Sequence, residues 1–247
     1  MDRLIYTAMS GARQIVEQQA TVANNLANVG STGFRAQVDT FRAVPVTGTG
    51  LSTRTQVQDD TVAANFSDGP IQATGRSLDV AVQGPGWLAV QGANGQEAYT
   101  RDGGLTLSAE GVLQTHSGLP VQGDGGPITL PSNASFSIGK DGTVSALLAG
   151  TTPALVTTVG RLKLVNPPTQ SMTRGDDGLF RQRNGSVAEA DPSVVLVGGA
   201  LEGSNVNVVE AMVRMISLGR QFDLNMNLLK NADSNATKAN QLLSLNG

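Results

Sequence analysis

The fold is decided first by residues 5–29, which read IYTAMSGARQIVEQQATVANNLANV. Small or apolar residues recur in this stretch at alternating intervals of three and four, and Gln19 is the only polar residue in the row. This spacing is the heptad pattern of a helix that buries one stripe against a partner helix. The row comprises Ile5, Ala8, Ala12, Ile15, Val22, Leu26 and Val29.

A row with the same spacing lies near the carboxyl end of the chain. It comprises Val208, Met212, Met215, Gly219, Phe222, Met226 and Leu229, and a second row at Val206, Val209, Val213 and Ile216 widens it. An isolated helix with one narrow apolar stripe is only marginally stable in water. We therefore predict that the two terminal helices pair with each other, with other subunits, or with both.

The middle of the chain has a different composition. All ten prolines lie between Pro45 and Pro192, and all but three of the 30 glycines lie between Gly30 and Gly203. From about residue 66 to residue 196, short alternating runs are separated by dipeptides that are typical of tight turns. This pattern predicts an antiparallel sandwich or barrel-like domain. The dipeptides are Asn94-Gly95, Asp102-Gly103, Asp124-Gly125, Asp141-Gly142, Asp177-Gly178 and Asn184-Gly185.

Together these patterns predict an α+β chain with a discontinuous helical part. Residues 1–30 and 204–247 are expected to form a coiled-coil-like, two-helix assembly domain. Residues 31–65 are expected to form an extended connecting segment, with strand fragments or a linker as alternatives for residues 34–65. Residues 66–203 are expected to form one all-β antiparallel domain of many short strands. We expect the first helix to run from about Arg3 to Asn28, and the second to have Ser204 or Asn205 as its N-cap.

Three asparagines lie near the end of the first predicted helix. Asn24 and Asn28 share one helix face, and Asn25 lies next to the apolar row. Amides at a helix contact fix its register, because a slipped pairing leaves a buried donor unsatisfied at about 1–3 kcal/mol. We predict this role for them, with a solvated helix end as the alternative.

Charge and hydropathy exclude several classes of partner. The formal net charge is -3, the pI is about 5.1, and the lysines and arginines are scattered. This is not the footprint of a nucleic-acid or anionic-lipid binder. No apolar run approaches the roughly 18–20 residues of a membrane span. Thr7, Ser10 and Gly11 interrupt the first apolar run, so we expect neither membrane insertion nor a cleaved signal peptide.

The residues that carry chemistry are sparse. His116 is the only histidine and the chain has no cysteine, so a His-based metal site or a catalytic triad would need partners that the sequence does not show. Gly84-Pro85-Gly86 precedes a predicted strand and is therefore not a phosphate loop. Turn chemistry accounts for the Asp-Gly pairs, and the spacing of a calcium loop is absent. We expect no catalytic residue, metal ligand, cofactor or small-molecule substrate.

Three pairs of segments then carry a resemblance. They are VANNLANV (22–29) with STGFR (31–35), GRSLDVAVQGPGW (75–87) with AYTRDG (98–103), and ALEGSNVNVVE (200–210) with MVRMI (212–216). In this order they resemble the bacterial flagellar rod and hook family, and the resemblance covers essentially the whole chain. It implies a helical inner domain built from both termini and one outer β domain.

The same resemblance implies a structural function. Subunits of this family stack helically into the basal-body rod, which crosses the periplasm and transmits torque for motility. Expected partners are copies of the chain, other rod proteins and the flagellar export apparatus, with no enzymatic activity. The assembly interface is then expected at Ile5, Ala8, Ala12, Ile15, Val22, Asn24, Asn25, Leu26, Asn28, Val208, Met212, Met215, Phe222, Met226 and Leu229.

Alternatives remain open at this point. Within the family, the short 34–65 connection, Arg220-Gln221-Phe222 and the tail 239–243 resemble proximal rod members most, with distal rod members as the near alternative. A secreted β-rich enzyme acting on cell-wall polysaccharide is a second class, although no acid pair is identifiable. A third is an adhesin with a coiled-coil stalk, whose isolated helices would form trimers.

Overall fold

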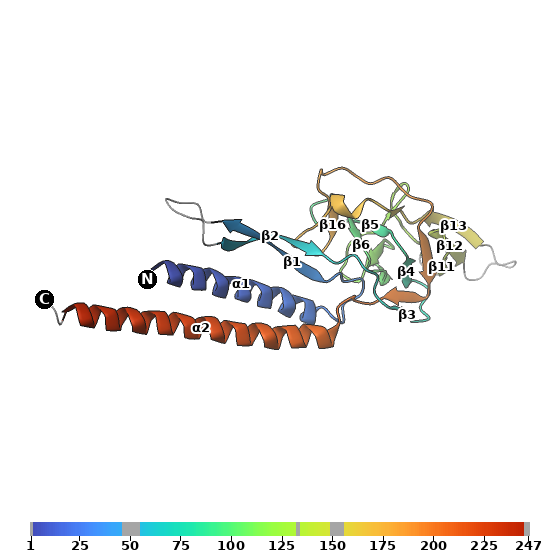
Figure 1. Ribbon diagram of the computed structural model, residues 1–247. Helices are drawn as coiled ribbons and strands as arrows, with labels where there is room; N and C mark the ends of the chain where they lie inside the picture. Colours follow the sequence, from blue (N-terminus) through green and yellow to red (C-terminus); the bar gives the residue numbers. More distant parts are fainter. Residues whose placement is uncertain (1, 46–54, 132–133, 149–155, 245–247) are drawn as a thin grey trace. The chain divides into compact units, whose positions relative to one another are not determined.

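The computed structural model describes residues 2–45, 55–131, 134–148 and 156–244 (Figure 1). Contacts within the chain divide it into two compact units. The helical unit contains Met1–Asn28, Gln37–Ala64 and Val206–Gly247. The β unit contains Val29–Ala36 and Asn65–Asn205. The chain therefore passes between the units four times, and residues 29–36 belong with the strands rather than with the helices.

Two helices dominate the helical unit. Helix α1 (Asp2–Ala27) and helix α2 (Val208–Ser244) lie side by side and antiparallel, with both termini of the chain at the same end of the pair (Figure 1). Their contact buries apolar side chains of both helices, as the heptad rows predict. The buried cluster comprises Ile15, Val22, Ala211 and Leu218, with Leu26, Val206, Met215 and Phe222 packed against it.

The N-cap of α2 is Asn207, so the prediction of Ser204 or Asn205 was wrong. The Asn207 Oδ1 accepts hydrogen bonds from the amides of Val209 at 3.0 Å and Glu210 at 3.2 Å. An N-cap side chain satisfies amides two or three residues ahead of it. Ser204 and Asn205 lie too early in the chain to reach these amides.

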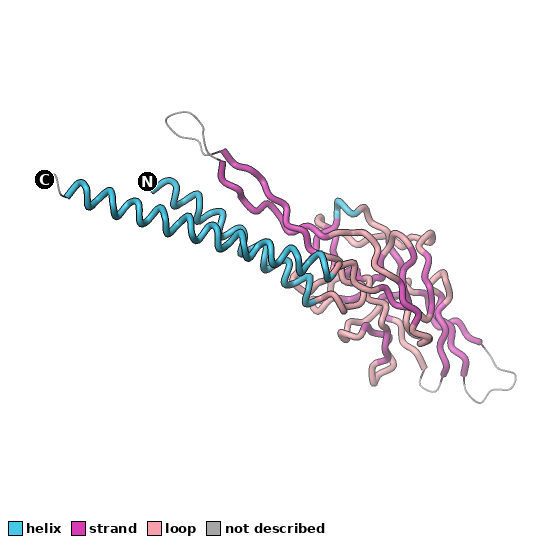
Figure 2. The backbone as a smooth tube through the Cα atoms, turned by 60° about the horizontal axis from the view of Figure 1, so that its bottom comes forward, coloured by secondary structure: helices cyan, strands magenta, loops and turns pink. Residues whose placement is uncertain are grey.

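A β-hairpin completes the helical unit. Strand β1 (Gln37–Pro45) pairs antiparallel with strand β2 (Thr55–Ala64), with a register shift between Thr40 and Phe41. The hairpin is held to α1 by the Thr21 hydroxyl, which donates to Asp39 Oδ1 at 2.6 Å. Most of the segment that was expected to be an extended connection is thus a paired hairpin, in line with the strand fragments that its weak alternation allowed. Figure 2 shows these two strands beside the helices.

The β unit consists of short strands, all paired antiparallel in the described ranges, as predicted. The strands are β3 (Ile71–Ala73), β4 (Val80–Gln83), β5 (Trp87–Gln91), β6 (Glu97–Thr100), β7 (Leu105–Leu107), β8 (Leu113–Thr115), β9 (Gln122–Gly123), β10 (Gly126–Pro127), β11 (Ala134–Ile138), β12 (Thr143–Leu148), β13 (Val156–Arg161), β14 (Leu164–Val165), β15 (Met172–Arg174), β16 (Phe180–Gln182), β17 (Val195–Gly198) and β18 (Ala200–Glu202).

These strands form several small sheets. The largest has the order β14-β5-β6-β16-β15, and a second has the order β11-β12-β13. The pairs β17-β4, β18-β3, β7-β8 and β10-β9 complete the unit. Pairing of β17 with β4 and of β18 with β3 joins the end of the β unit to its beginning, so the carboxyl-terminal strands close the unit.

Most of the predicted turn dipeptides connect neighbouring strands. Asn94-Gly95 lies between β5 and β6, Asp141-Gly142 between β11 and β12, and Asp177-Gly178 between β15 and β16. Asp102-Gly103 does not form such a hairpin turn. A Cβ atom on Gly103 would lie 1.7 Å from the Val80 carbonyl oxygen, so this glycine permits a close approach of two backbone segments.

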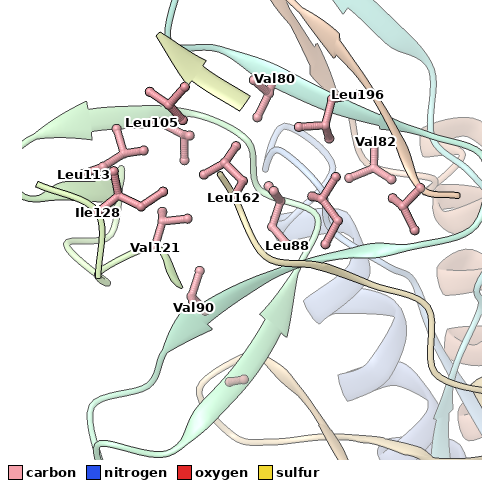
Figure 3. Packing of buried hydrophobic residues seen from close by; sticks show 14 of the residues in the cluster. Val80, Val82, Leu88, Val90, Leu105, Leu113, Val121, Ile128, Leu162 and Leu196 are labelled. Carbon is pink, nitrogen blue, oxygen red and sulfur yellow. The ribbon is translucent and has the colours of Figure 1, made fainter. Parts of the chain in front are cut away.

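One continuous hydrophobic core supports the β unit. Its buried side chains include Val80, Val82, Leu88, Val90, Leu105, Leu113, Val121, Ile128, Leu162 and Leu196 (Figure 3). They come from strands and connecting segments far apart in the sequence, and β17 contributes Leu196 to the same cluster as β4 and β5. Burial of such side chains stabilises the fold by about 1.5–3 kcal/mol each.

The neighbouring residues Val194 and Val195 test this core. Val194 is 2% exposed and belongs to the buried cluster, whereas Val195 is 39% exposed. We expect Val194→Ala to lower the free energy of unfolding by about 2 kcal/mol, because two buried methyl groups are lost and a cavity is left. Val195→Ala, the matched control, should change it by less than about 1 kcal/mol. Urea unfolding of both purified variants measures the difference, and equal losses would contradict this placement of the core.

Candidate assembly interface and the ion-pair junction

Of the predicted interface residues of α1, Ile15, Val22 and Leu26 pack against α2. Ala12, Ile15 and Val22 are buried, and Ala8 and Leu26 are partly buried. The side chain of Ile5 lies outside the described residues. The three-four row of α1 therefore identifies the side of this helix that packs within the chain.

The observed contact row of α2 differs from the predicted row at every second residue, where the contact residue lies one position earlier in the chain. The residues that face α1 include Ala211, Met215, Leu218 and Phe222, whereas the predicted row ran through Met212 and Gly219. Both rows have three-four spacing and share Met215 and Phe222, so spacing alone does not distinguish them. Val208 and Leu229 are partly buried, but Met212 is 49% exposed and Met226 is 37% exposed.

Exposed apolar side chains cover the side of α2 opposite its contact with α1. The outer face of α2 is defined here as Val209, Met212, Val213 and Ile216, with exposed fractions of 71%, 49%, 62% and 59%. At 3.6 residues per turn these four lie within two turns, away from Ala211. Leu224 and Leu228, 64% and 56% exposed, extend the apolar character along the helix. Exposed apolar residues gathered on one helix face make this face a candidate interaction site.

Helix α1 has an exposed apolar flank as well. Met9 is 55% exposed and Val16 is 48% exposed, and the exposed residues Ala20, Ala23 and Ala27 continue the row. This flank differs from the side that faces α2 and from the side that binds the hairpin. Neither exposed stripe is covered by the described part of the helical unit.

The sequence suggested that the three asparagines lie where the two helices meet. In the structure they do not lie together in the α1–α2 contact. The Asn25 side chain pairs with the backbone of Gln37 at the start of β1, where Nδ2 donates to the carbonyl at 2.8 Å and Oδ1 accepts from the amide at 2.7 Å. Asn24 is exposed, and Asn28 Nδ2 donates to the Asn24 backbone carbonyl at 2.9 Å. Asn25 therefore sets the register between α1 and the hairpin. Spacing could not reveal this, because the hairpin was not predicted as a partner of α1.

The β unit contains a buried ion-pair junction of Arg35, Arg101 and Glu202, which are 1%, 3% and 1% exposed. Arg35 Nη1 lies 2.8 Å from Glu202 Oε1, and Arg101 Nη1 lies 2.8 Å from Glu202 Oε2. One carboxylate thus forms ion pairs with two guanidinium groups, and its Oε1 also accepts a hydrogen bond from the Gly69 amide at 2.9 Å. A buried carboxylate is tolerated in an interior only with such complete pairing.

Asp68 supplies the second negative charge of the junction. Its half-exposed carboxylate lies 3.1 Å from Arg35 Nη2 and 3.6 Å from Arg101 Nη2. Two cations and two anions then balance. Burial lowers the pKa of the Arg35 guanidinium, and the facing Glu202 carboxylate opposes this shift. Each arginine also donates to a backbone carbonyl, Arg35 to that of Ser67 and Arg101 to that of Gly84 at 2.7 Å. The Nε atoms of both arginines are buried and have no hydrogen-bond partner among the described residues.

An aromatic cluster covers the two arginines. The guanidinium carbon of Arg101 lies 5.3 Å from the ring centroid of Trp87, and that of Arg35 lies 5.9 Å from it. Trp87 packs in turn against Phe66 and Phe180, with ring centroids 6.0 Å and 4.6 Å away. Cation–π contacts of this kind add to ion pairing where water is excluded.

Residues 31–35 reach the junction by a close backbone approach. Gly33 has φ of +65°, and a Cβ atom there would lie 2.2 Å from the carbonyl carbon of Arg101. Its amide donates to the Glu202 carbonyl at 2.8 Å. The Thr32 hydroxyl donates to Asp102 Oδ1 at 2.7 Å. Only glycine permits this combination of positive φ and contact distance.

The sequence patterns predicted no role for Arg35, Arg101 or Glu202. A signal was present, because each is a charged residue next to or near a glycine in one of the three segments that carry the family resemblance. Their convergence could not be deduced, since it depends on pairings between residues separated by more than 60 positions.

Within the described ranges, no three His, Cys, Asp or Glu side chains form a group that could hold a metal ion. Among the helices that the structure describes, none is long and apolar enough to cross a membrane. His116 is exposed, in the turn between Thr115 and Gly118.

Comparison with known proteins identifies the family of this chain. The FlgF flagellar basal-body rod protein of Salmonella typhimurium strain LT2 is 49% identical over 251 residues, which cover 99% of this chain and 100% of that protein. The chain belongs to the flagellar basal-body rod protein family. FlgF of Escherichia coli K12 is 48% identical over 99% of the chain and 100% of its own length. A FlgG rod protein of Buchnera aphidicola from Schizaphis graminum is 32% identical over 90% of the chain and 92% of its length.

Three family models match separate parts of this rod-family chain. The flagella basal body rod protein model matches residues 5–35, the FlgE/F/G D1 domain model of the flagellar hook protein matches residues 81–146, and the FlgEFG C-terminal model matches residues 197–242. Arg35 lies in the first, Arg101 in the second and Glu202 in the third. The junction therefore joins three segments of the chain that the family models match.

Replacing Glu202 tests the junction. We expect Glu202→Gln to lower the free energy of unfolding by about 3–5 kcal/mol, because the two buried arginines lose their shared counter-charge. Glu110→Gln is the control, since Glu110 is exposed and its replacement should change stability by less than about 0.5 kcal/mol. Guanidinium unfolding of the purified full chain measures both. A loss below about 1 kcal/mol for Glu202→Gln would show that the ion pairs do not hold the segments together.

Proposed function

We propose that this chain is a structural subunit of the flagellar basal-body rod and that it assembles through the exposed apolar faces of α1 and α2. The observation that carries the proposal is the outer face of α2. One side of α2 is already filled by α1, and the opposite side exposes Val209, Val213 and Ile216. The FlgF relatives over the full length of the chain support a rod subunit, and the lower identity of the FlgG relative makes the distal-rod alternative weaker.

The expected partners are copies of this chain and other rod proteins. The residues suited to such contacts are those exposed in the helical unit, including Met212 and Met226 from the predicted interface. Ile15 and Leu218 instead contribute indirectly, because they hold the two helices together. We propose that the pair behaves as an antiparallel coiled coil to which neighbouring subunits add further helices.

Assembly follows from burial of these apolar faces. Each exposed Val, Ile or Met that becomes buried contributes about 1.5–3 kcal/mol before the loss of freedom on association is subtracted. Because the same contact repeats at every subunit of a helical stack, small gains add along the rod. Torque is then transmitted by packed side chains, and the mechanism needs no catalytic group.

The route to the rod is part of the proposal. We infer export through the flagellar export apparatus without cleavage of a signal peptide, and a final location in the rod within the periplasm. Helices whose outer faces are covered only on docking gain stability at the growing end. The family assignment places the chain among structural proteins, so we propose no enzymatic activity on the cell wall.

Val213→Asp tests the outer face of α2. Val213 is 62% exposed, so the introduced carboxylate stays solvated in the monomer and stability should change by less than about 0.5 kcal/mol. In the assembled rod the same carboxylate is buried and unpaired, which costs several kcal/mol at each contact. We expect loss of swimming and no complete rods in basal bodies isolated from cells that carry only this variant.

The matched control for this experiment is Val187→Asp in the β unit. Val187 is 60% exposed, so the substitution is the same and the starting exposure is close to the 62% of Val213. Cells with this variant should swim normally. Complete rods and normal swimming with Val213→Asp would refute the proposed interface.

Leu218→Asp separates assembly from folding of the helix pair. Leu218 is 3% exposed and packs in the α1–α2 contact. We expect this variant to lose helical circular dichroism already as a purified monomer, because a buried carboxylate without a partner costs several kcal/mol. Unchanged helix content in the monomer would mean that α1 and α2 do not depend on each other before assembly.

A further inference from the structure

One asparagine of the β unit lies where three of the four connections between the units begin. The chain passes between the units after residues 28, 36, 64 and 205. At three of these places the boundary residue on the β-unit side is Ala36, Asn65 or Asn205. All three belong to the β unit, and they are bonded to one another there.

The Asn205 carboxamide makes these bonds. Its Oδ1 accepts from the Ala36 amide at 2.7 Å, and its Nδ2 donates to the carbonyls of Asn65 at 2.9 Å and Ser67 at 2.8 Å. The backbone continues the pattern, because the Asn65 amide donates to the Ala36 carbonyl at 2.8 Å and the Asn205 amide donates to the Phe34 carbonyl at 3.3 Å. Three chain segments are thus hydrogen-bonded to one another at, or within three residues of, the points where they leave the β unit.

Resting on the proposed function, we propose that Asn205 is a positioning residue for rod assembly: its carboxamide holds the three connections from which the hairpin and α2 leave the β unit. Fixed connections give every subunit the same starting points for its assembly elements. A helical stack repeats one contact geometry, so connections that vary between subunits would prevent the repeat.

The chemistry of the site requires an amide. Asn205 uses one acceptor and two donors at the same time, and asparagine supplies both from one short side chain. A carboxylate of the same shape would keep the bond from Ala36 but would face the Asn65 and Ser67 carbonyls without a proton to donate. A serine side chain is too short to reach all three partners, and alanine has no hydrogen-bonding group.

Asn205 is also tied to the ion-pair junction. The Ser67 carbonyl that accepts from Asn205 accepts from Arg35 as well, and Glu202 lies three residues before Asn205. Strand β18 therefore ends with Glu202 beside the two arginines, and the residues that follow it place Asn205 beside the connections. Capping of α2 does not explain the residue, because Asn207 performs that function.

The test uses Asn205→Asp in the full chain, with Asn184→Asp as the matched control. The Asn184 Oδ1 accepts from the Ser186 amide in an exposed turn, a bond that a carboxylate retains. We measure hydrogen exchange of the purified monomer, expressed as protection relative to intrinsic exchange, at the amides of Asn65 and Asn205. At pH 7 we expect at least about tenfold lower protection there in Asn205→Asp, unchanged protection in the core at Leu113, and no change in the control.

The pH dependence identifies the lost donors. The two carbonyls disfavour the charged form of the introduced carboxylate, so its pKa in the folded chain lies above its unfolded value. Stability lost at pH 7 should therefore return as the pH falls toward about 4, where the carboxyl group regains a proton to donate. Asn205→Ala also loses protection but should show no such recovery. Loss in both variants with the same pH profile would overturn the hydrogen-bonding role.

The assembly arm uses cells that carry only the variant chain. Asn205→Asp should be exported yet give incomplete rods and a large loss of swimming, whereas Asn184→Asp should swim normally. Unchanged protection at Asn65 in the monomer, or complete rods despite reduced protection, would each overturn the proposal. Failure of the proposed function itself is distinguishable, because it appears as complete rods with Val213→Asp.

Discussion

The carboxylate of Glu202, held between Arg35 and Arg101, is the interaction on which the other features of the β unit depend. It lies at the end of the last strand and binds one residue from the segment after α1 and one from the middle of the unit. Removing water from these charges is expensive, and Asp68, the Gly69 amide and the surrounding carbonyls offset part of this cost. The fold therefore requires all three segments at once.

This requirement explains several neighbouring features. Gly33 must come close to the backbone of Arg101 for Arg35 to reach Glu202, and Trp87 excludes water from both guanidinium groups. An apolar cluster of the same volume could stabilise the unit as well, but it would tolerate a shifted strand. We put forward as a hypothesis that the charged junction is used for specificity, since each ion pair is satisfied in one register of β18 only.

The two units solve different problems. The β unit closes on itself through a hydrophobic core and the junction, whereas the helical unit buries one side of each helix and leaves Val213 and Val16 exposed. A protein that assembles needs such incomplete burial, because the surface that stabilises the polymer must be free in the subunit. Asn25 and Asn205 use the same chemistry in the two units, since each carboxamide both donates to and accepts from backbone groups.

The sequence by itself determined the α+β class, both helices and the many short antiparallel strands, because heptad spacing and turn dipeptides are local patterns that need no partner to be recognised. The family followed separately, from the resemblance of three ordered pairs of segments. It identified Ile15 and Val22 as contact residues, but it could not choose between Met212 and Leu218, since both rows of α2 have the same period. Only the tertiary structure decided that Leu218 packs within the chain, that Asn25 binds the hairpin, and that Arg35, Arg101 and Glu202 meet. Each of these depends on the direction in which a side chain points when distant segments come together, and that direction follows from the packing of the whole chain.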